Sequence, residues 1–202
     1  MNLFKNTLVP LLFVVIAWFS VGQAQAAIIS IETDKQQYLV GEKITAFLKV
    51  SQADVLLSGF FLALQYQHSA LAVLQWGYGN SFDDGFGSYQ FGEHDLANGR
   101  LSVEDYADWA ADQSLLAALQ SGGFLLATVE FQALVGGQLS LSLDPTYLGL
   151  LTFDGELRQP SWAGADITVI DNPHAVPAAP VLVLMLGGLL GMLAQRRQQT
   201  SI

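Results

Sequence analysis

Apolar and polar residues alternate along the chain from Ile28 onward, and this period of two constrains the fold more than any other feature of the sequence. Ile29 and Ile31 fall on one parity, and four apolar residues in the range 44–50 do the same. Successive side chains of a β-strand point to opposite faces of its sheet, so the alternation predicts strands that bury one face. A turn over 40–43, which contains Gly41, separates these first two strands.

Further strands are expected where short apolar runs stand between turn residues. The longest covers 55–66 and is nearly all apolar in its middle, which indicates a central position in a sheet. Strands that recur at this spacing predict an antiparallel β-sandwich rather than alternating strands and helices. The remaining predicted strands are 71–76, 101–106, 124–133, 138–143 and 167–170.

Two segments between these strands have other compositions. The range 77–99 holds six glycines together with aromatic and acidic residues, and it is predicted to be a loop. The range 112–120 carries three leucines at helical spacing behind Asp112, a residue type that caps helix N-termini. It is the one predicted helix in the body of the chain.

The N-terminal segment is typical of an exported protein. Lys5 precedes an apolar run over 8–21, and Ala24 and Ala26 are small residues at the two positions that a signal peptidase recognises. We therefore expect residues 1–26 to be a signal peptide that is removed after Ala26. An uncleaved membrane anchor is the alternative.

A second apolar segment lies near the C-terminal end. Residues 181–194 are apolar, they follow a spacer that contains Pro177 and Pro180, and Arg196 and Arg197 come soon afterwards. This order predicts that the segment 173–202 contains a transmembrane helix whose arginines stay on the cytoplasmic side. A helix buried in the core is the alternative. A terminal helix that is apolar on every face and ends in two arginines is, however, poorly suited to a core.

Three features follow one another in this segment: the proline spacer 176–180, the glycine-containing apolar run 186–191, and the pair Arg196-Arg197. In this order they resemble the PEP-CTERM type of bacterial sorting signal. The Pro-Glu-Pro triplet that names that family is replaced here by Pro177-Ala178-Ala179-Pro180. The resemblance implies an exported protein of a Gram-negative bacterium, anchored in the envelope membrane or released to the outer surface by an exosortase-type processing enzyme.

Between the two ends, residues 27–172 have the size of one domain. This segment holds all 18 acidic residues and five basic ones, which is a formal net charge of −13. Such a charge repels phosphate backbones, so we exclude nucleic acid as a partner. The chain has no cysteine, which excludes disulfides, thiolate metal sites and a cysteine nucleophile.

Acidic residues gather in the range 83–112, and oxygen-rich loops are what calcium requires. Asp83, Asp84 and Asp95 are the candidate ligands for calcium, which is the one cofactor that the sequence suggests. A solvated acidic loop is the alternative, since the spacing matches no EF-hand. Nothing forces two acids to face one another as a glycosidase requires, and the chain has no nucleophile elbow, so we predict that it is not an enzyme.

Aromatic residues are concentrated around the predicted glycine-rich loop, and they form our candidate for the functional surface. Rings set among glycines and acids offer a large contact area to a protein or to a stacked sugar. The alternative is that part of the set caps one end of the core. The candidate residues are Trp76, Tyr78, Phe82, Phe86, Tyr89 and Trp109.

Packing motifs follow a particular order in the body of the chain: the turn 40–42, the segment 57–66 with Leu71 shortly after it, and the glycine-led strand 123–133. In this order they resemble the cohesin family, and the resemblance spans nearly all of 28–170. Cohesins are jelly-roll β-sandwiches and non-catalytic modules that bind dockerins. The resemblance therefore implies an antiparallel jelly-roll β-sandwich that binds a partner and is not an enzyme.

Our expectation is an exported, membrane-anchored binding or adhesion module that recognises an extracellular protein or a polysaccharide. A structural protein of the envelope or extracellular matrix that associates with like copies is the alternative. A carbohydrate-active enzyme is the weaker one.

Overall fold

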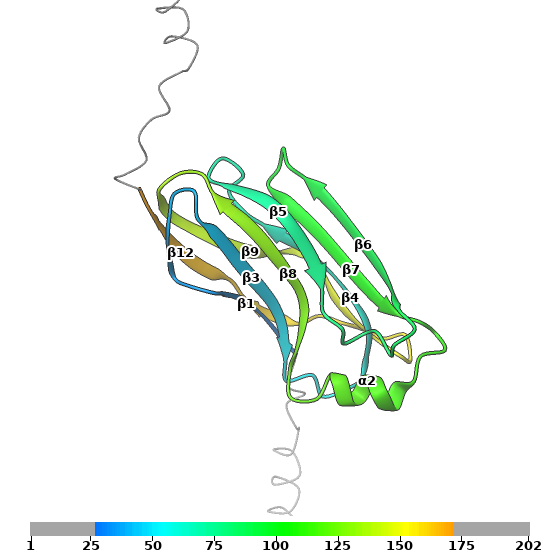
Figure 1. The fold of residues 1–202 in the computed structure, drawn as a ribbon. Coiled ribbons are helices and arrows are strands. Elements are labelled where there is room, and N and C mark those ends of the chain that lie inside the picture. Colours follow the sequence, from blue (N-terminus) through cyan, green and yellow to red (C-terminus); the bar gives the residue numbers. More distant parts are fainter. Residues whose placement is uncertain (1–26, 172–202) are drawn as a thin grey trace, which may run out of the picture.

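Two β-sheets packed face to face form residues 27–171, the part of the chain that the structure, a computed structural model, describes (Figure 1). Apolar side chains fill the space between the sheets, and the one helix of this part of the chain lies at one end. The all-β, two-sheet sandwich expected from the alternation is therefore confirmed.

The first sheet has five strands in the order β11-β1-β3-β8-β5. Neighbouring strands run antiparallel, except that β11 pairs with β1 in parallel. Its strands are β1 (Ile28–Thr33), β3 (Lys43–Ser51), β5 (Leu71–Tyr78), β8 (Phe124–Ala133) and β11 (Ser161–Ala163).

The second sheet has seven strands, in the order β2-β12-β9-β4-β7-β6 with β10 paired to β9. Here β2 pairs with β12 in parallel. The two parallel pairs depart from the predicted antiparallel arrangement, because three-residue stretches of connecting chain run along the outer strands. The strands are β2 (Gln37–Leu39), β4 (Leu57–Gln65), β6 (Ser88–Asp95), β7 (Arg100–Ala107), β9 (Gly137–Thr152), β10 (Leu157–Arg158) and β12 (Ala165–Ile170).

The prediction of a loop over 77–99 is wrong for the strand β6, which pairs with β7 along its whole length. Glycine content favoured a loop, but Gly92 lies inside the strand for a packing reason. A Cβ atom at Gly92 would come within 2.6 Å of Trp76 Nε1. The middle of β6 is exposed because the strand forms a sheet edge, so it lacks the burial alternation of the other strands.

The strand β9 is also longer than the predicted segment 138–143. Its first part pairs with β12, and its second part continues past Pro145 to pair with β4. The register between β4 and β9 shifts between Leu62 and Leu64, which accommodates the irregular residues around Pro145. The extension matters because it carries Tyr147 onto the outer face of the second sheet.

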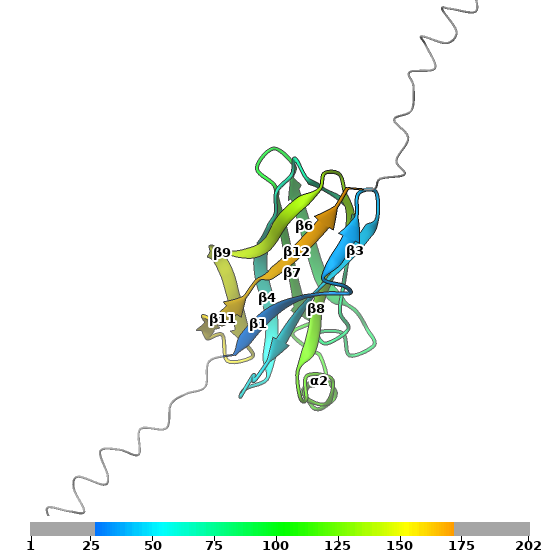
Figure 2. The ribbon, with the colours of Figure 1, turned by 90° about the vertical axis from the view of Figure 1, so that its left-hand side faces the viewer.

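The helix α2 (Gln113–Leu119) confirms the predicted helix and its cap. Asp112 Oδ1 accepts hydrogen bonds from the backbone N–H groups of Ser114 and Leu115. Leu116 is the buried residue of the helix, and Gln120 follows at its C-terminal end. Figures 1 and 2 place α2 at the end of the sandwich opposite the one where β12 ends.

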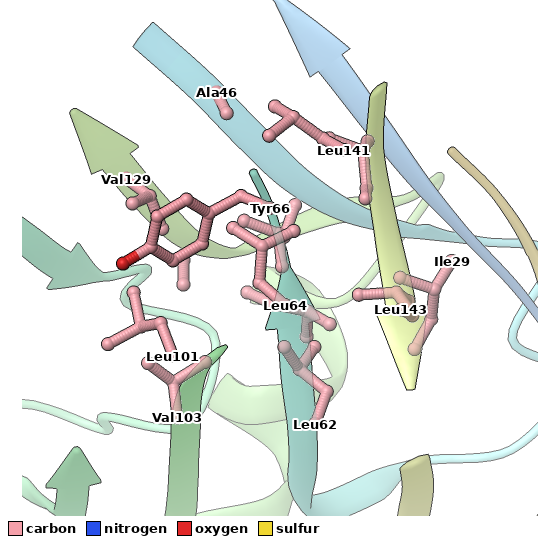
Figure 3. Packing of buried hydrophobic residues seen from close by; sticks show 14 of the residues in the cluster. Ile29, Ala46, Leu62, Leu64, Tyr66, Leu101, Val103, Val129, Leu141 and Leu143 are labelled. Atoms are coloured by element: carbon pink, nitrogen blue, oxygen red, sulfur yellow. The ribbon is translucent and has the colours of Figure 1, made fainter. Parts of the chain in front are cut away.

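The core is built from the inward-facing parity of each long strand. Because alternate side chains of a strand share a face, both sheets contribute rows of leucine, isoleucine, valine and aromatic residues to one cluster. Removing one such side chain costs about 2–5 kcal/mol of stability. The labelled members in Figure 3 are Ile29, Ala46, Leu62, Leu64, Tyr66, Leu101, Val103, Val129, Leu141 and Leu143, all of them buried.

The predicted signal peptide with Ala24 and Ala26 lies outside the described residues. The same holds for the predicted C-terminal anchor with Pro177, Pro180, Arg196 and Arg197. Within residues 27–171, no helix has the length and apolar character needed to cross a membrane.

Candidate binding face

The six aromatic residues singled out in the sequence separate into three places in the structure. Phe82 belongs to the core and not to a binding surface, since only 1% of it is exposed. Its ring centroid lies 5.6 Å from that of Phe60 and 5.8 Å from that of Phe124. Phe82 is therefore one of the aromatic residues that cap an end of the hydrophobic core, which was the alternative interpretation of the aromatic set.

Trp76 and Tyr78 connect the edge strands of the two sheets. The Tyr78 hydroxyl, on β5, donates to the Phe91 carbonyl oxygen of β6 at 2.5 Å. The Trp76 ring packs against Gly92, and its centroid lies 6.3 Å from that of the His94 ring. Both residues thus hold the open side of the sandwich together, and Trp76 remains partly exposed.

Phe86, Tyr89 and Trp109 are exposed, and they lie where β6 begins and β7 has ended. Phe86 is 96% exposed and Trp109 is 88% exposed. The Tyr89 hydroxyl donates to Asp108 Oδ2 at 2.9 Å, which ties β6 to the segment that carries Trp109. All three residues are therefore accessible, and the bond between Tyr89 and Asp108 joins two of the segments that carry them.

Tyr89 continues into a larger outward-facing cluster that the sequence analysis did not bring together. Strand register places Tyr89 beside Tyr106, and Phe91 beside Glu104. The next strand places Phe61 beside Glu104 as well. We use the term aromatic face for Phe61, Tyr89, Phe91, Tyr106, Tyr147 and Glu104, which lie on the outer side of β6, β7, β4 and β9.

Two glycines make room for rings on this face. A Cβ atom at Gly59 would lie 2.5 Å from Tyr106 Cδ1, and one at Gly149 would lie 2.5 Å from Phe61 Cζ. Each ring therefore covers the backbone of the neighbouring strand where a side chain is missing. Since these rings are only partly exposed, the cluster has a packed base from which Phe91 and Tyr89 project further.

Glu104 lies among the rings and accepts from two phenols. The Tyr106 hydroxyl donates to Glu104 Oε2 at 2.6 Å, and the Tyr147 hydroxyl donates to Glu104 Oε1. The hydrogen bond to Glu104 and burial raise the pKa of Tyr147 to about 12. Burial, together with the Glu104 bond, raises the pKa of Tyr106 as well. Both phenols are thus donors at neutral pH, and they orient the carboxylate.

Arg100 borders the cluster. Its guanidinium lies 4.9 Å from the centroid of the Tyr147 ring, and its Nε is 3.5 Å from Asp144 Oδ2. Its Nη1 also donates to Ser102 Oγ at 2.7 Å. The Arg100 charge is therefore matched by Asp144 rather than by Glu104.

The structure does not bring the three candidate calcium ligands together. Asp83 Oδ1 accepts from the N–H groups of Gly85 and Gly87, each at 2.7 Å, and so holds its own loop. Asp84 Oδ2 accepts from Asp112 N at 2.8 Å. Asp95 lies at the far end of β6, and a strand of eight residues spans more than about 20 Å.

Asp95 is also engaged locally, since its carboxylate accepts from the backbone and side-chain amides of Asn98. These bonds lower the pKa of Asp95. Across residues 27–171, no group of three or more histidine and acidic side chains has an arrangement that suits a metal ion.

The fold was compared with solved structures. A type II cohesin domain from the cellulosome of Acetivibrio cellulolyticus is 23% identical over 70% of this chain and 95% of its own, with a TM-score of 0.60. A type II cohesin from the same organism, in a cohesin-X-dockerin complex, is 18% identical over 72% of this chain and 95% of its own, with a TM-score of 0.55. The non-cellulosomal cohesin of the archaeon Archaeoglobus fulgidus is 17% identical over 74% and 95%, with a TM-score of 0.56.

No protein-family model matches the sequence, and no curated protein is detectably similar to it. The structural likeness nevertheless extends over nearly the whole length of these cohesin chains. Residues 27–171 therefore have the cohesin fold, as the order of packing motifs predicted.

Proposed function

We propose that this chain is a non-catalytic module that binds another protein through the aromatic face. The observation that carries the proposal is the outward-facing cluster of aromatic rings around Glu104, on four adjacent strands of one sheet. Phe91, with 57% of its surface exposed, projects from this cluster although it would be favourable to bury. Tyrosine and phenylalanine are enriched in protein interfaces, where a rigid ring gives a large contact area.

The structural comparisons support a protein as the partner. One of the similar cohesins was solved in a complex with an X-dockerin, so a domain of this fold can bind a protein. A rigid, packed base suits such a role because few side chains have to lose conformational freedom when the partner binds. The proposal for this chain is a protein partner in general, and a dockerin is one candidate.

Export and anchoring complete the proposal. We infer from residues 1–26 and 173–202 that the domain is exported and then held at the envelope membrane, or released after processing of a PEP-CTERM-like signal. The strand β12 ends at the end of the sandwich opposite α2 (Figures 1 and 2). An anchor beyond residue 171 would therefore leave the α2 end, with Phe86 and Trp109, directed away from the membrane.

The test compares partner capture by variants of the full chain, immobilised and exposed to secreted and envelope proteins of the producing organism. Phe91→Ala and Tyr89→Ala should each weaken capture of the same protein by about tenfold or more, as loss of a central interface ring does. Trp162→Ala is the matched control, because Trp162 is a partly exposed ring on β11 of the other sheet. Capture that is insensitive to Phe91 and Tyr89, or recovery of this chain alone, contradicts the proposal.

A further inference from the structure

Glu104 is a charged group at the centre of the aromatic face, and no cation of the described chain pairs with it. Both of its oxygens accept from tyrosine hydroxyls, as described above. None of the ion pairs formed within residues 27–171 includes Glu104. The nearby cation, Arg100, is paired with Asp144. The face therefore presents a negative charge that is oriented but not neutralised.

The surroundings strengthen this negative potential. Glu93 projects from the same face of β6, and its charge makes the smallest of the contributions that raise the pKa of Tyr147. Asp108 lies at the edge of the face, where Tyr89 holds it. The whole domain is acidic as well, with 18 acidic residues against five basic ones. A partner surface that complements this face therefore carries positive charge.

The rings around Glu104 narrow the chemistry further. The Phe91 and Tyr106 centroids lie 6.4 Å apart, and the Phe61 and Tyr147 centroids lie 5.3 Å apart, so two ring pairs flank the carboxylate. Aromatic faces attract ammonium and guanidinium groups, and a carboxylate between them adds a charge-assisted hydrogen bond. An apolar partner that covered Glu104 would instead bury an unpaired charge, which is costly.

We propose, on the basis of the protein-binding role proposed above, that the aromatic face recognises its partner through a lysine or arginine side chain that pairs with Glu104 between the rings. The apolar stem of that side chain would lie along Phe91, and its charged end would reach Glu104. The two tyrosine hydroxyls orient the carboxylate for this contact, so the site does not have to order itself on binding.

The test uses random linear peptides displayed on phage and selected on the immobilised full chain. Selected peptides should share a lysine or arginine. Replacing that residue by acetyl-lysine or citrulline should weaken binding by about tenfold or more, and so should Glu104→Gln. When the neutral peptide is combined with Glu104→Gln, the affinity should fall little further than with either change alone, because both changes remove the same contact.

Glu93→Gln is the matched control, since it removes the same charge from the same face without touching the tyrosine contacts. It should weaken binding by less than about threefold. Selected peptides without a basic residue, or equal binding to Glu104→Gln and to the unaltered chain, would overturn the inference. If those peptides still depend on Phe91, the protein-binding role stands and only the basic side chain is wrong. If Phe91→Ala has no effect on them, both proposals fail.

Discussion

The phenol ring of Tyr106 on β7 lies against Gly59 on β4, where a Cβ atom would come within 2.5 Å of Tyr106 Cδ1 and 2.8 Å of the Asp105 carbonyl oxygen. The missing side chain lets the ring cover the neighbouring strand. It thereby sets the position from which the Tyr106 hydroxyl reaches Glu104. One glycine in a central strand is thus part of the candidate binding face.

Gly59→Ala tests this relationship. The added methyl group forces the Tyr106 ring or the β7 backbone to move, and overpacking of this kind costs about 1–3 kcal/mol of stability. Partner capture should fall as well, because the ring that it displaces holds Glu104. Urea unfolding and the capture assay measure the two effects on the same protein.

Gly77→Ala is the control for Gly59→Ala. Gly77 also lies in a strand, β5, but a Cβ atom there would meet nothing within 4 Å. Its effect on stability should stay within about 0.5 kcal/mol. Equal effects of the two substitutions would mean that Gly59 is not a special packing position.

The sequence was sufficient for most strands and for α2, because their signals are local. In β3 one parity is buried along the whole strand, in β8 one parity is buried from Ala127 to Ala133, and Asp112 marks the start of the helix. The strand β6 has no such signal. It is a sheet edge, its middle is exposed, and its glycine is there because Trp76 packs against it from another strand.

The aromatic face could be predicted only in part, because it is assembled from residues that are far apart in the chain. Phe61 stands inside an almost continuous apolar run, so nothing local distinguishes its outward side chain from the inward Phe60. Glu104 meets Tyr147 across 43 positions, through a part of β9 that was not predicted. Asp95 shows the opposite effect. It is only twelve positions from Asp83 in the sequence, but the extended strand β6 places the two residues far apart.

Phe82 and Phe86 are four positions apart and should behave in opposite ways. Phe82 is packed between Phe60 and Phe124, so Phe82→Ala should lower the free energy of unfolding by about 3–5 kcal/mol. Phe86 is almost fully exposed, so Phe86→Ala should change it by less than about 0.5 kcal/mol. Denaturant unfolding of the two variants checks the pair, and similar losses would contradict the assignment of Phe82 to the core.

Gln120 should be a stability residue rather than a binding residue. Its buried amide accepts from Leu57 N at 2.9 Å and donates to the carbonyl oxygens of Leu57 and Ser81, at 2.8 and 3.1 Å. It therefore joins the end of α2 to the start of β4 and to the loop before β6. Gln120→Ala leaves these buried backbone groups unpaired and should cost about 2–3 kcal/mol.

Gln120→Glu makes the same point with little change of volume. The carboxylate can still accept from Leu57 N, but it cannot donate to the two carbonyl oxygens when ionised. It should be destabilising at neutral pH, and part of the loss should be recovered on acidification as the carboxyl gains a proton. Ser121→Ala, at the next and exposed position, is the comparison, and a similar loss there would show that Gln120 is not special.

Asp105 should make the domain less stable at neutral pH than in mild acid. It is an inward-facing carboxyl of β7 with no exposed surface, and its Oδ1 has no hydrogen-bond partner. Gln90 Nε2 reaches Oδ2 only at 3.4 Å. Burial raises the pKa of Asp105 above its ordinary value of 3.8, and the charge of Asp83 adds to the shift.

The direction of the pH dependence follows from that shift. A carboxyl whose pKa is higher in the folded state contributes its full stabilisation when it is protonated in both states, and loses it as the pH rises through the folded pKa. Asp105→Asn removes the charge, so at pH 7 it should raise the free energy of unfolding by about 1–3 kcal/mol. The gain should shrink as the pH falls toward 3.8. Urea unfolding over a pH series measures it, with the exposed Asp166→Asn as control, and a variant that is less stable than the natural chain at pH 7 would mean that the buried charge is compensated.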